Sequence, residues 1–211
     1  TYIDIAKKCD YIFTSDSNKI EDYKKDCNNE NVFVMEFGIN PIIQNPIGMK
    51  NEYKQNAVLF AGSYMRRFEE RCNDMEQIFD GVLEYGRKLN ILDRNFDLGL
   101  SWYGFPYKYV SYISPGVNHE DLQKIHKLYD WVINLNSIKY SPTMCAMRIY
   151  ESQALGNAIL SNYSLAVETY NPNVFIIKNK EDVIKIFTDY NKEETYEHQI
   201  KSIRHVMSNQ T

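Results

Sequence analysis

Short apolar runs alternate along this chain with longer stretches in which apolar residues recur every three or four positions. The runs at residues 58–61 and 131–133 are apolar at every position, which is typical of strands buried on both faces of a sheet. Strands that alternate with helical stretches build a parallel sheet covered by helices. The pattern therefore predicts an α/β fold with a doubly wound parallel sheet.

The positions of these runs set the expected strands and helices. In the clearest helix, residues 65–89, apolar residues lie three, four or seven positions apart, with charged residues between them. A second helix follows Asn118, which suits the cap, and Glu120 and Asp121 suit its first turn. We expect His126 to lie at the surface of this helix. The expected strands are residues 11–16, 31–38, 57–63, 96–104, 110–114, 131–137, 158–162 and 174–178, and the further helices are 144–155, 181–190 and 193–207.

The segment between residues 38 and 56 is polar, lacks periodicity and holds two prolines and two glycines, which favours a connection between domains. We expect a linker at residues 46–56. Residues 1–45 then form a remnant of one Rossmann-like unit, and residues 57–211 form a nearly complete strand-helix domain. Because the chain starts without methionine, we also expect it to be a piece of a longer protein.

Composition narrows the classes of function. The 211 residues are 44% hydrophobic and 25% charged, as in folded globular domains. The net charge of −4 and the lack of a basic block argue against duplex nucleic acid as a partner. No apolar stretch approaches the roughly 20 residues of a membrane span. The four cysteines are far apart in the sequence, so we expect reduced thiols and a cytoplasmic protein.

Several common catalytic signatures are absent from the sequence. It contains no G-x-S-x-G, no G-x-x-x-x-G-K-[ST], no G-x-G-x-x-G and no H-E-x-x-H. No two aspartates are separated by a single residue, so the metal-binding D-x-D pair is also missing. We therefore expect neither a metal site nor a cofactor.

The loops at the carboxyl ends of the strands remain as candidate sites, because open parallel sheets bind ligands there. The first candidate is Gly62 and Ser63, whose small side chains let backbone amides approach a ligand, followed by Arg66. Together they could hold a phosphate. The alternative is that Gly62 and Ser63 only start the long helix and that the arginine is solvated.

The second candidate is the start of the helix expected at residues 144–155. Ser141 suits the N-cap and Pro142 the first helical position. The free amides of the first turn, at Thr143 and Met144, would carry partial positive charge and attract an anion. The alternative is that these amides bind only water.

The third candidate is the pair Arg148 and Glu151, which lie three residues apart on one helical face, before the glycine at 156 that ends the helix. A carboxylate beside a buried strand can accept hydrogen bonds from two ribose hydroxyls, and an arginine can hold a diphosphate. The alternative is an ordinary ion pair within the helix.

The run from Arg148 to Gly156 (RIYESQALG), preceded by Ser141 and Pro142 and followed by residues 158–161, resembles the nucleotide-sugar motif of GT-B glycosyltransferases, most closely the CgeB-like group. Residues 9–14, 34–41 and 58–63 agree with that family in the same order. The resemblance covers nearly the whole chain. It implies the carboxyl-terminal, Rossmann-like half of a GT-B fold, with a remnant of the amino-terminal half.

The resemblance also implies roles for the candidate residues. Glu151 would contact the ribose of the nucleotide, the amides near Ser141, Thr143 and Met144 together with Arg66 would hold the diphosphate, and the base would lie near residues 114–119. Many retaining members have a glutamate where this chain has Thr143, so donor sugar and stereochemistry stay open.

The implied function is metal-independent transfer of a sugar from a nucleoside-diphosphate sugar to an unknown acceptor, which is a glycan, a protein or a lipid-linked molecule. The acceptor pocket usually belongs to the amino-terminal half, so a chain without that half is expected to be inactive by itself. The alternative is a non-catalytic Rossmann-like module that serves interaction or assembly.

Overall fold

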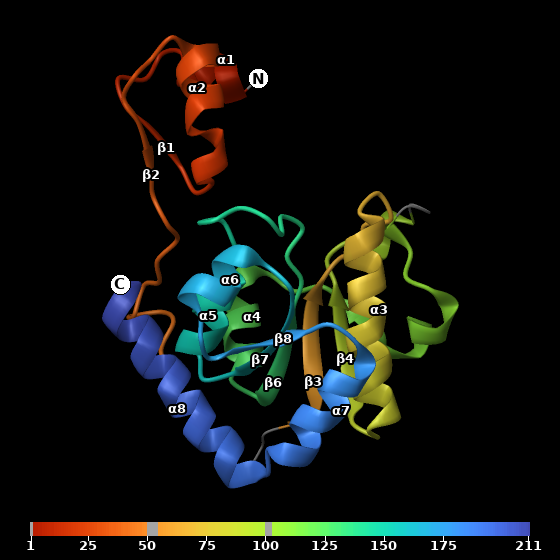
Figure 1. Ribbon diagram of the computed structural model, residues 1–211. Helices are drawn as coiled ribbons and strands as arrows, with labels where there is room; N and C mark the ends of the chain where they lie inside the picture. The colour runs from red at the N-terminus through yellow and green to blue at the C-terminus, as the bar shows by residue number, and fades with distance from the viewer. Residues whose placement is uncertain (1, 50–54, 100–102) are drawn as a thin grey trace.

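The computed structural model describes residues 2–49, 55–99 and 103–211. Its centre is a parallel sheet of six strands in the order β5-β4-β3-β6-β7-β8 (Figure 1). From β3 the chain moves outward to β5 on one side, and from β6 it moves outward to β8 on the other, which is the doubly wound order of a Rossmann-like sheet. The strands are β3 (Gln55–Gly62), β4 (Lys88–Asp93), β5 (Ile113–Pro115), β6 (Tyr129–Asn134), β7 (Ala158–Asn162) and β8 (Val174–Ile177).

Helices cover both faces of this sheet (Figure 1). On one face α3 (Glu69–Glu84) and α7 (Lys180–Asp189) pack against side chains such as Val58 and Phe60. On the other, α4 (His119–His126), α5 (Arg148–Ala154), α6 (Leu165–Tyr170) and α8 (Lys192–Asn209) pack with side chains such as Leu59 and Ile159. Successive residues of β3 point to opposite faces, and because both faces are covered, every position in its centre is apolar.

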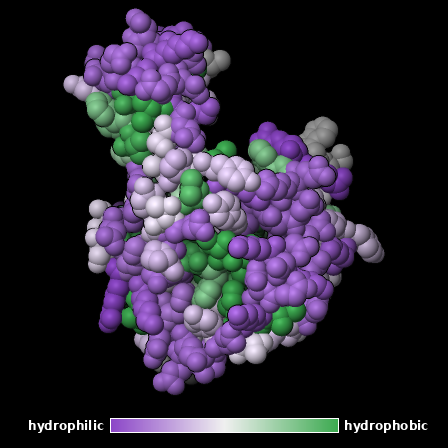
Figure 2. Space-filling view, in the orientation of Figure 1, coloured by the Kyte–Doolittle hydropathy of each residue, from purple (hydrophilic) through white to green (hydrophobic). Residues whose placement is uncertain are grey.

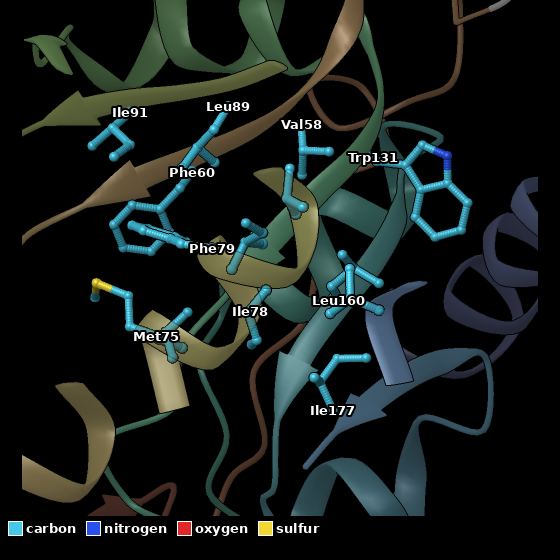
Figure 3. Packing of buried hydrophobic residues seen from close by; sticks show 14 of the residues in the cluster. Val58, Phe60, Met75, Ile78, Phe79, Leu89, Ile91, Trp131, Leu160 and Ile177 are labelled. Carbon is cyan, nitrogen blue, oxygen red and sulfur yellow. The ribbon is translucent and has the colours of Figure 1, made fainter. Parts of the chain in front are cut away.

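The core under α3 and α7 is largely aromatic and aliphatic (Figure 3). The rings of Phe60 and Phe79 meet edge to face with their centroids 5.3 Å apart, and Phe79 meets Tyr109 in the same way at 5.2 Å. Trp131 and Phe187 are 5.0 Å apart. These contacts fix the sheet rigidly against its helices, and so fix the loops at the carboxyl ends of the strands.

The amino-terminal residues form a small separate unit (Figure 1). It contains α1 (Tyr2–Ala6), β1 (Ile12–Thr14), α2 (Ile20–Cys27) and β2 (Val32–Val34), with β1 and β2 paired in parallel. Figure 2 shows this unit joined to the main body by a narrow neck, with hydrophobic surface on the side that faces the neck. Phe13 and Phe33 are 57% and 47% exposed, so one side of its sheet is left uncovered by the described residues.

The chain between this unit and β3 packs on the carboxyl-terminal helix. The amide of Ile39 donates to the carbonyl of Gln210 over 2.7 Å, and Ile39 and Met49 are both buried. The expected linker at residues 46–56 lies partly outside the described residues, and the division into 1–45, 46–56 and 57–211 stays a prediction.

The structure corrects several expected boundaries. The helix predicted at residues 65–89 is α3, which ends at Glu84, and Leu89 belongs to β4. The strand predicted at residues 96–104 is wrong where the structure describes it: Phe96–Leu98 is a 3₁₀ turn, and residues 100–102 lie outside the described part. A second 3₁₀ turn, Tyr107–Tyr112, occupies most of the strand predicted at 110–114. Among the unpredicted elements are α2, α6 and the turn Ser17–Lys19.

Candidate functional site

A cavity of about 380 Å³ lies at the carboxyl ends of the central strands. Ala61 and Gly62 from the end of β3 and Asn134 from the end of β6 line it. β3 and β6 are the neighbours from which the chain winds in opposite directions. In open parallel sheets, the crevice at this switch point is the favoured place for a ligand.

Three arginines from three different elements line this cavity. Arg71 lies in the first turn of α3, Arg94 follows β4, and Arg148 begins α5. Arg71 donates from Nη1 to the carbonyl of Ser63 over 3.1 Å, and its buried Nε has no partner among the described residues. Within the described chain, the Arg148 side chain makes no hydrogen bond or ion pair at contact distance. The cavity therefore contains guanidinium groups that the surrounding described residues do not fully pair.

The pKa values of Arg148 and Arg71 report this crowding. Burial lowers the pKa of Arg148 to about 10; the carboxylate of Glu151 opposes this shift, and the charges of Arg71 and Arg94 add to it. The pKa of Arg71 is also lowered, first by burial and then in part by the charge of Arg94. The Arg148 guanidinium remains charged at neutral pH. Like charges held together in a partly buried site favour the binding of an anion.

Glu151 supplies the one carboxylate among the described residues that line the cavity. It is 8% exposed, and its Oε1 accepts from Nε2 of Gln44 at 3.4 Å and lies 3.4 Å from Nε2 of His119. Both contacts are long for hydrogen bonds. The carboxylate is thus buried, held loosely, and available to accept shorter hydrogen bonds from a ligand.

Polar atoms without partners gather around the same cavity. Six buried side-chain atoms in the described residues lack a hydrogen-bond partner, and three of them belong to cavity-lining residues: Arg71 Nε, Gln123 Oε1 and Asn134 Oδ1. Buried polar groups are nearly always paired, so such atoms need an explanation. A bound polar ligand, or water in its place, would give these atoms hydrogen-bond partners.

Four of the residues predicted from the sequence meet at this cavity. Gly62, Ser63, Arg148 and Glu151 all line it. Arg148 and Glu151 do not form the close ion pair that was the alternative for them, because the partners of Glu151 are Gln44 and His119. Arg66 points elsewhere: its guanidinium donates to the carbonyl of Gly104 at 3.2 and 3.3 Å, and the side chain is exposed.

The predicted anion cradle at residues 141–144 is wrong in its geometry. The helix begins at Arg148 rather than Met144, so Ser141 is not its N-cap. The amides of Thr143 and Met144 are not free, because both donate to Oγ of Ser141, at 3.4 and 3.0 Å. None of the three lines the cavity, whose wall here is formed by residues 146–148.

These residues instead contact the amino-terminal unit. Ser141 Oγ donates to Oδ1 of Asp16 over 2.6 Å. Thr143 Oγ1 donates to the carbonyl of Ser15 over 2.8 Å and accepts from the amide of Ser17 over 3.0 Å. The loop expected to hold a ligand therefore holds the two parts of the chain together.

Sequence reasoning missed Arg71, Arg94 and His126. His126 is not at the surface as expected; it is 4% exposed and lines the cavity. Arg71 carried a weak signal, since a basic residue near the start of a helix opposes the helix dipole and so favours another role. Arg94 carried none, because the strand that precedes it was not predicted: residues 88 and 89 were assigned to the end of a helix and residues 90–93 to no element.

Other kinds of site find less support in the described residues. Among them, no group of three or more His, Cys, Asp or Glu side chains has the arrangement of a metal site, and Cys9, Cys27, Cys72 and Cys145 are free thiols. No helix in the described ranges has both the length and the apolar character that crossing a membrane requires.

No protein-family profile matches this sequence, and no curated protein sequence matches it. Solved structures do match in fold. TarM from S. aureus, solved in a complex that includes UDP, is 11% identical in sequence, with a TM-score of 0.64. The match covers 99% of this chain and 43% of the TarM chain. HepE from Anabaena, in complex with UDP and glucose, is 9% identical with a TM-score of 0.66, covering 98% and 61%. A glycosyltransferase from Rickettsia africae is 16% identical with a TM-score of 0.64, covering 100% and 62%.

These neighbours are GT-B glycosyltransferases, and this chain spans about half their length. At such low identity the comparison speaks for the fold alone. The fold expected from the resemblance of the run from Arg148 to Gly156 is confirmed. The six-stranded parallel sheet flanked by helices has the fold of the Rossmann-like half of a GT-B glycosyltransferase.

Proposed function

We propose that this chain is the donor-binding half of a glycosyltransferase that moves a sugar from a nucleoside-diphosphate sugar to an acceptor. The observation that carries the proposal is the joining of three guanidinium groups and one buried carboxylate in a single cavity at the switch point of the sheet. A nucleoside diphosphate matches that arrangement, because it combines two phosphoryl groups with two ribose hydroxyls.

The arginines serve the leaving group. When the bond between sugar and diphosphate breaks, negative charge grows on the phosphate oxygens, and fixed positive groups lower the energy of that transition state. Arg148, Arg71 and Arg94 would fill this role; all three line the cavity, together with Gly62 and Ser63. Because guanidinium groups supply the positive charge, the proposal needs no metal ion and no cofactor.

Glu151 serves the nucleoside. Its carboxylate is acceptor-only when ionised and can take both ribose hydroxyls. Arg148 and Glu151 are separated by less than one turn of α5, so the diphosphate and the ribose would lie side by side along that helix. TarM and HepE were solved with UDP, which makes UDP the first ligand to test.

The remaining parts of the proposal concern the whole protein. The acceptor, a glycan, a protein or a lipid-linked molecule, would bind an amino-terminal half of which residues 1–45 are a remnant. The chain alone would bind UDP weakly and would not transfer sugar. Neighbours of about twice this length support the existence of that half. A cytoplasmic location is proposed, since nucleotide sugars and free thiols fit it.

A calorimetric titration of the 211-residue chain with UDP, and then with GDP, ADP and CDP, tests the proposal. Arg148→Gln and Glu151→Gln should each weaken binding about tenfold or more, because each removes a charge-assisted hydrogen bond. Arg204→Gln, on the exposed side of α8, is the matched control and should bind as the unaltered chain does. Binding of no nucleoside diphosphate by the unaltered chain would favour the non-catalytic interaction module instead.

A further inference from the structure

One wall of the cavity is formed by two hydrogen-bond acceptors on helix α4. Gln123 and His126 lie three residues apart on the same helical face, and both line the cavity. Oε1 of Gln123 has no partner among the described residues. This wall differs in character from the one formed by Arg71, Arg94 and Arg148, which offers only donors.

The surroundings of His126 determine which ring nitrogen carries the proton. Nδ2 of Asn157 donates to two backbone carbonyls, those of His126 at 2.9 Å and Tyr129 at 2.8 Å. This orientation makes Oδ1 of Asn157 an acceptor, and it lies 3.3 Å from Nδ1 of His126. Nδ1 therefore holds the proton, with Ser152 Oγ also near it at 3.2 Å. Nε2 is then the nitrogen with the free lone pair.

His126 is uncharged at neutral pH. Its pKa is lowered to about 3, first by burial and then by the charge of Arg148, while the hydrogen bond to Asn157 opposes the shift. Nε2 makes no hydrogen bond to any residue in the described ranges. It is a neutral acceptor in a fixed position, with no protein donor to satisfy it.

The chemistry of a nucleoside diphosphate limits which part of it Nε2 of His126 can meet. Ser152, which touches the imidazole, directly follows Glu151 in α5 and lies one helical turn after Arg148. Position alone therefore does not separate the phosphate from the nucleoside. Phosphate oxygens are acceptors and repel a lone pair, whereas ribose O–H and base N–H groups are donors.

We propose that Nε2 of His126 accepts a hydrogen bond from an O–H or N–H group of the bound nucleoside, and that the α4 wall is the subsite that selects the nucleoside. The inference rests on the proposed function, since it assumes a nucleoside diphosphate in this cavity. It adds a specificity-determining residue that the diphosphate and ribose assignments do not contain.

Nitrogen-detected NMR of the histidine side chains in the 211-residue chain tests this without altering the site. In the free protein, His126 should show a protonated Nδ1 and an unprotonated Nε2, with the signals assigned by their loss in His126→Gln. Saturating UDP should move the Nε2 resonance in the direction of an accepted hydrogen bond, and inorganic pyrophosphate should not. Ribose 5-phosphate separates the two donors: a shift with it assigns a ribose hydroxyl, and a shift with UDP alone assigns the base.

Substitution supplies a second measurement. His126→Leu removes the acceptor and should weaken UDP binding about tenfold while leaving pyrophosphate binding unchanged, whereas His126→Gln keeps an acceptor and should recover part of the loss. A merely structural role for His126 would weaken both ligands equally.

The outcomes separate the two proposals. UDP binding with an unmoved Nε2 signal, or a proton found on Nε2, overturns this inference and leaves the proposed function standing. Binding of no nucleoside diphosphate by the unaltered chain overturns both.

Discussion

Nε2 of Gln44 donates to Oε1 of Glu151 over 3.4 Å, although 107 positions separate the two residues in the sequence. Gln44 is 5% exposed, and its own Oε1 accepts from the amide of Asn40 over 2.7 Å. The carboxylate proposed to hold the ribose is thus held in turn by the segment that precedes the sheet. If Glu151 holds the ribose as proposed, ligand binding and the conformation of that segment would be coupled through the Gln44 side chain.

Removing that side chain should loosen Glu151. We expect Gln44→Leu to weaken UDP binding severalfold, because the carboxylate loses one of the groups that fix its position. Inorganic pyrophosphate, which lacks the ribose, should bind as before and serves as the control ligand. Calorimetry with both ligands measures the effect, and equal losses for the two would contradict a role acting through Glu151.

Substitution of a cavity arginine should weaken UDP binding more than substitution of Arg66, which lies outside the cavity. Arg94→Gln should weaken UDP binding severalfold at low ionic strength and less at high salt, because its charge lies near the surface and is screened. Arg66→Gln is the matched control, since Arg66 donates to the carbonyl of Gly104 rather than lining the cavity. A titration series in sodium chloride measures both, and a larger effect of Arg66→Gln would show that the guanidinium groups are wrongly assigned.

Gly156 should be intolerant of a side chain. Its φ of +88° suits glycine, and an added Cβ would lie 2.7 Å from Sδ of the buried Met49. Gly86 has nearly the same φ, +89°, but no described atom within 4 Å. Gly86→Ala should therefore cost only the backbone strain, about 1 kcal/mol of unfolding free energy, and Gly156→Ala about 2 to 4 kcal/mol. Urea denaturation compares the two, and equal costs would refute the contact with Met49.

His126 should make the protein less stable in acid. Burial lowers its pKa from 6.5 to about 3, so between these values the unfolded chain binds a proton that the folded chain does not. Stability should then fall as the pH drops below 6.5, by up to about 1.4 kcal/mol per pH unit from this residue. His126→Gln should show a shallower dependence, although His198, whose pKa burial also lowers, contributes in both proteins. Urea midpoints at pH 7, 6 and 5 test this, and parallel profiles would contradict it.

The local pattern of the sequence located the central strands of the sheet to within a few residues, because their centres are apolar. The strand at residues 158–162 has the predicted bounds, and Asn118 caps α4 as expected, accepting from the amide of Asp121. The clearest failure is at Leu89, which lies seven positions after Val82 and so continues the helical spacing. Gly86 ends the helix with a positive φ, and the periodicity of side chains carries no trace of that turn.

The site was predictable only where its parts are neighbours in sequence. Arg148 and Glu151 share one short helix, and Gly156 ends it as predicted: its amide donates to Gln153, and that of Asn157 donates to Ser152. Arg94 reaches the same cavity from a distant segment, and Gln44 reaches Glu151 from another. Their roles depend on the order of strands and on the path of the chain along α8, neither of which spacing reveals.

Ser141 has a single hydroxyl proton and gives it to the carboxylate of Asp16, while the same oxygen receives two amides from its own loop. The hydroxyl thus cannot turn to another acceptor without abandoning Asp16. Any movement of residues 2–35 away from the sheet would have to break this bond together with the two bonds that Thr143 makes to Ser15 and Ser17. The orientation of the amino-terminal unit therefore depends on this one short loop.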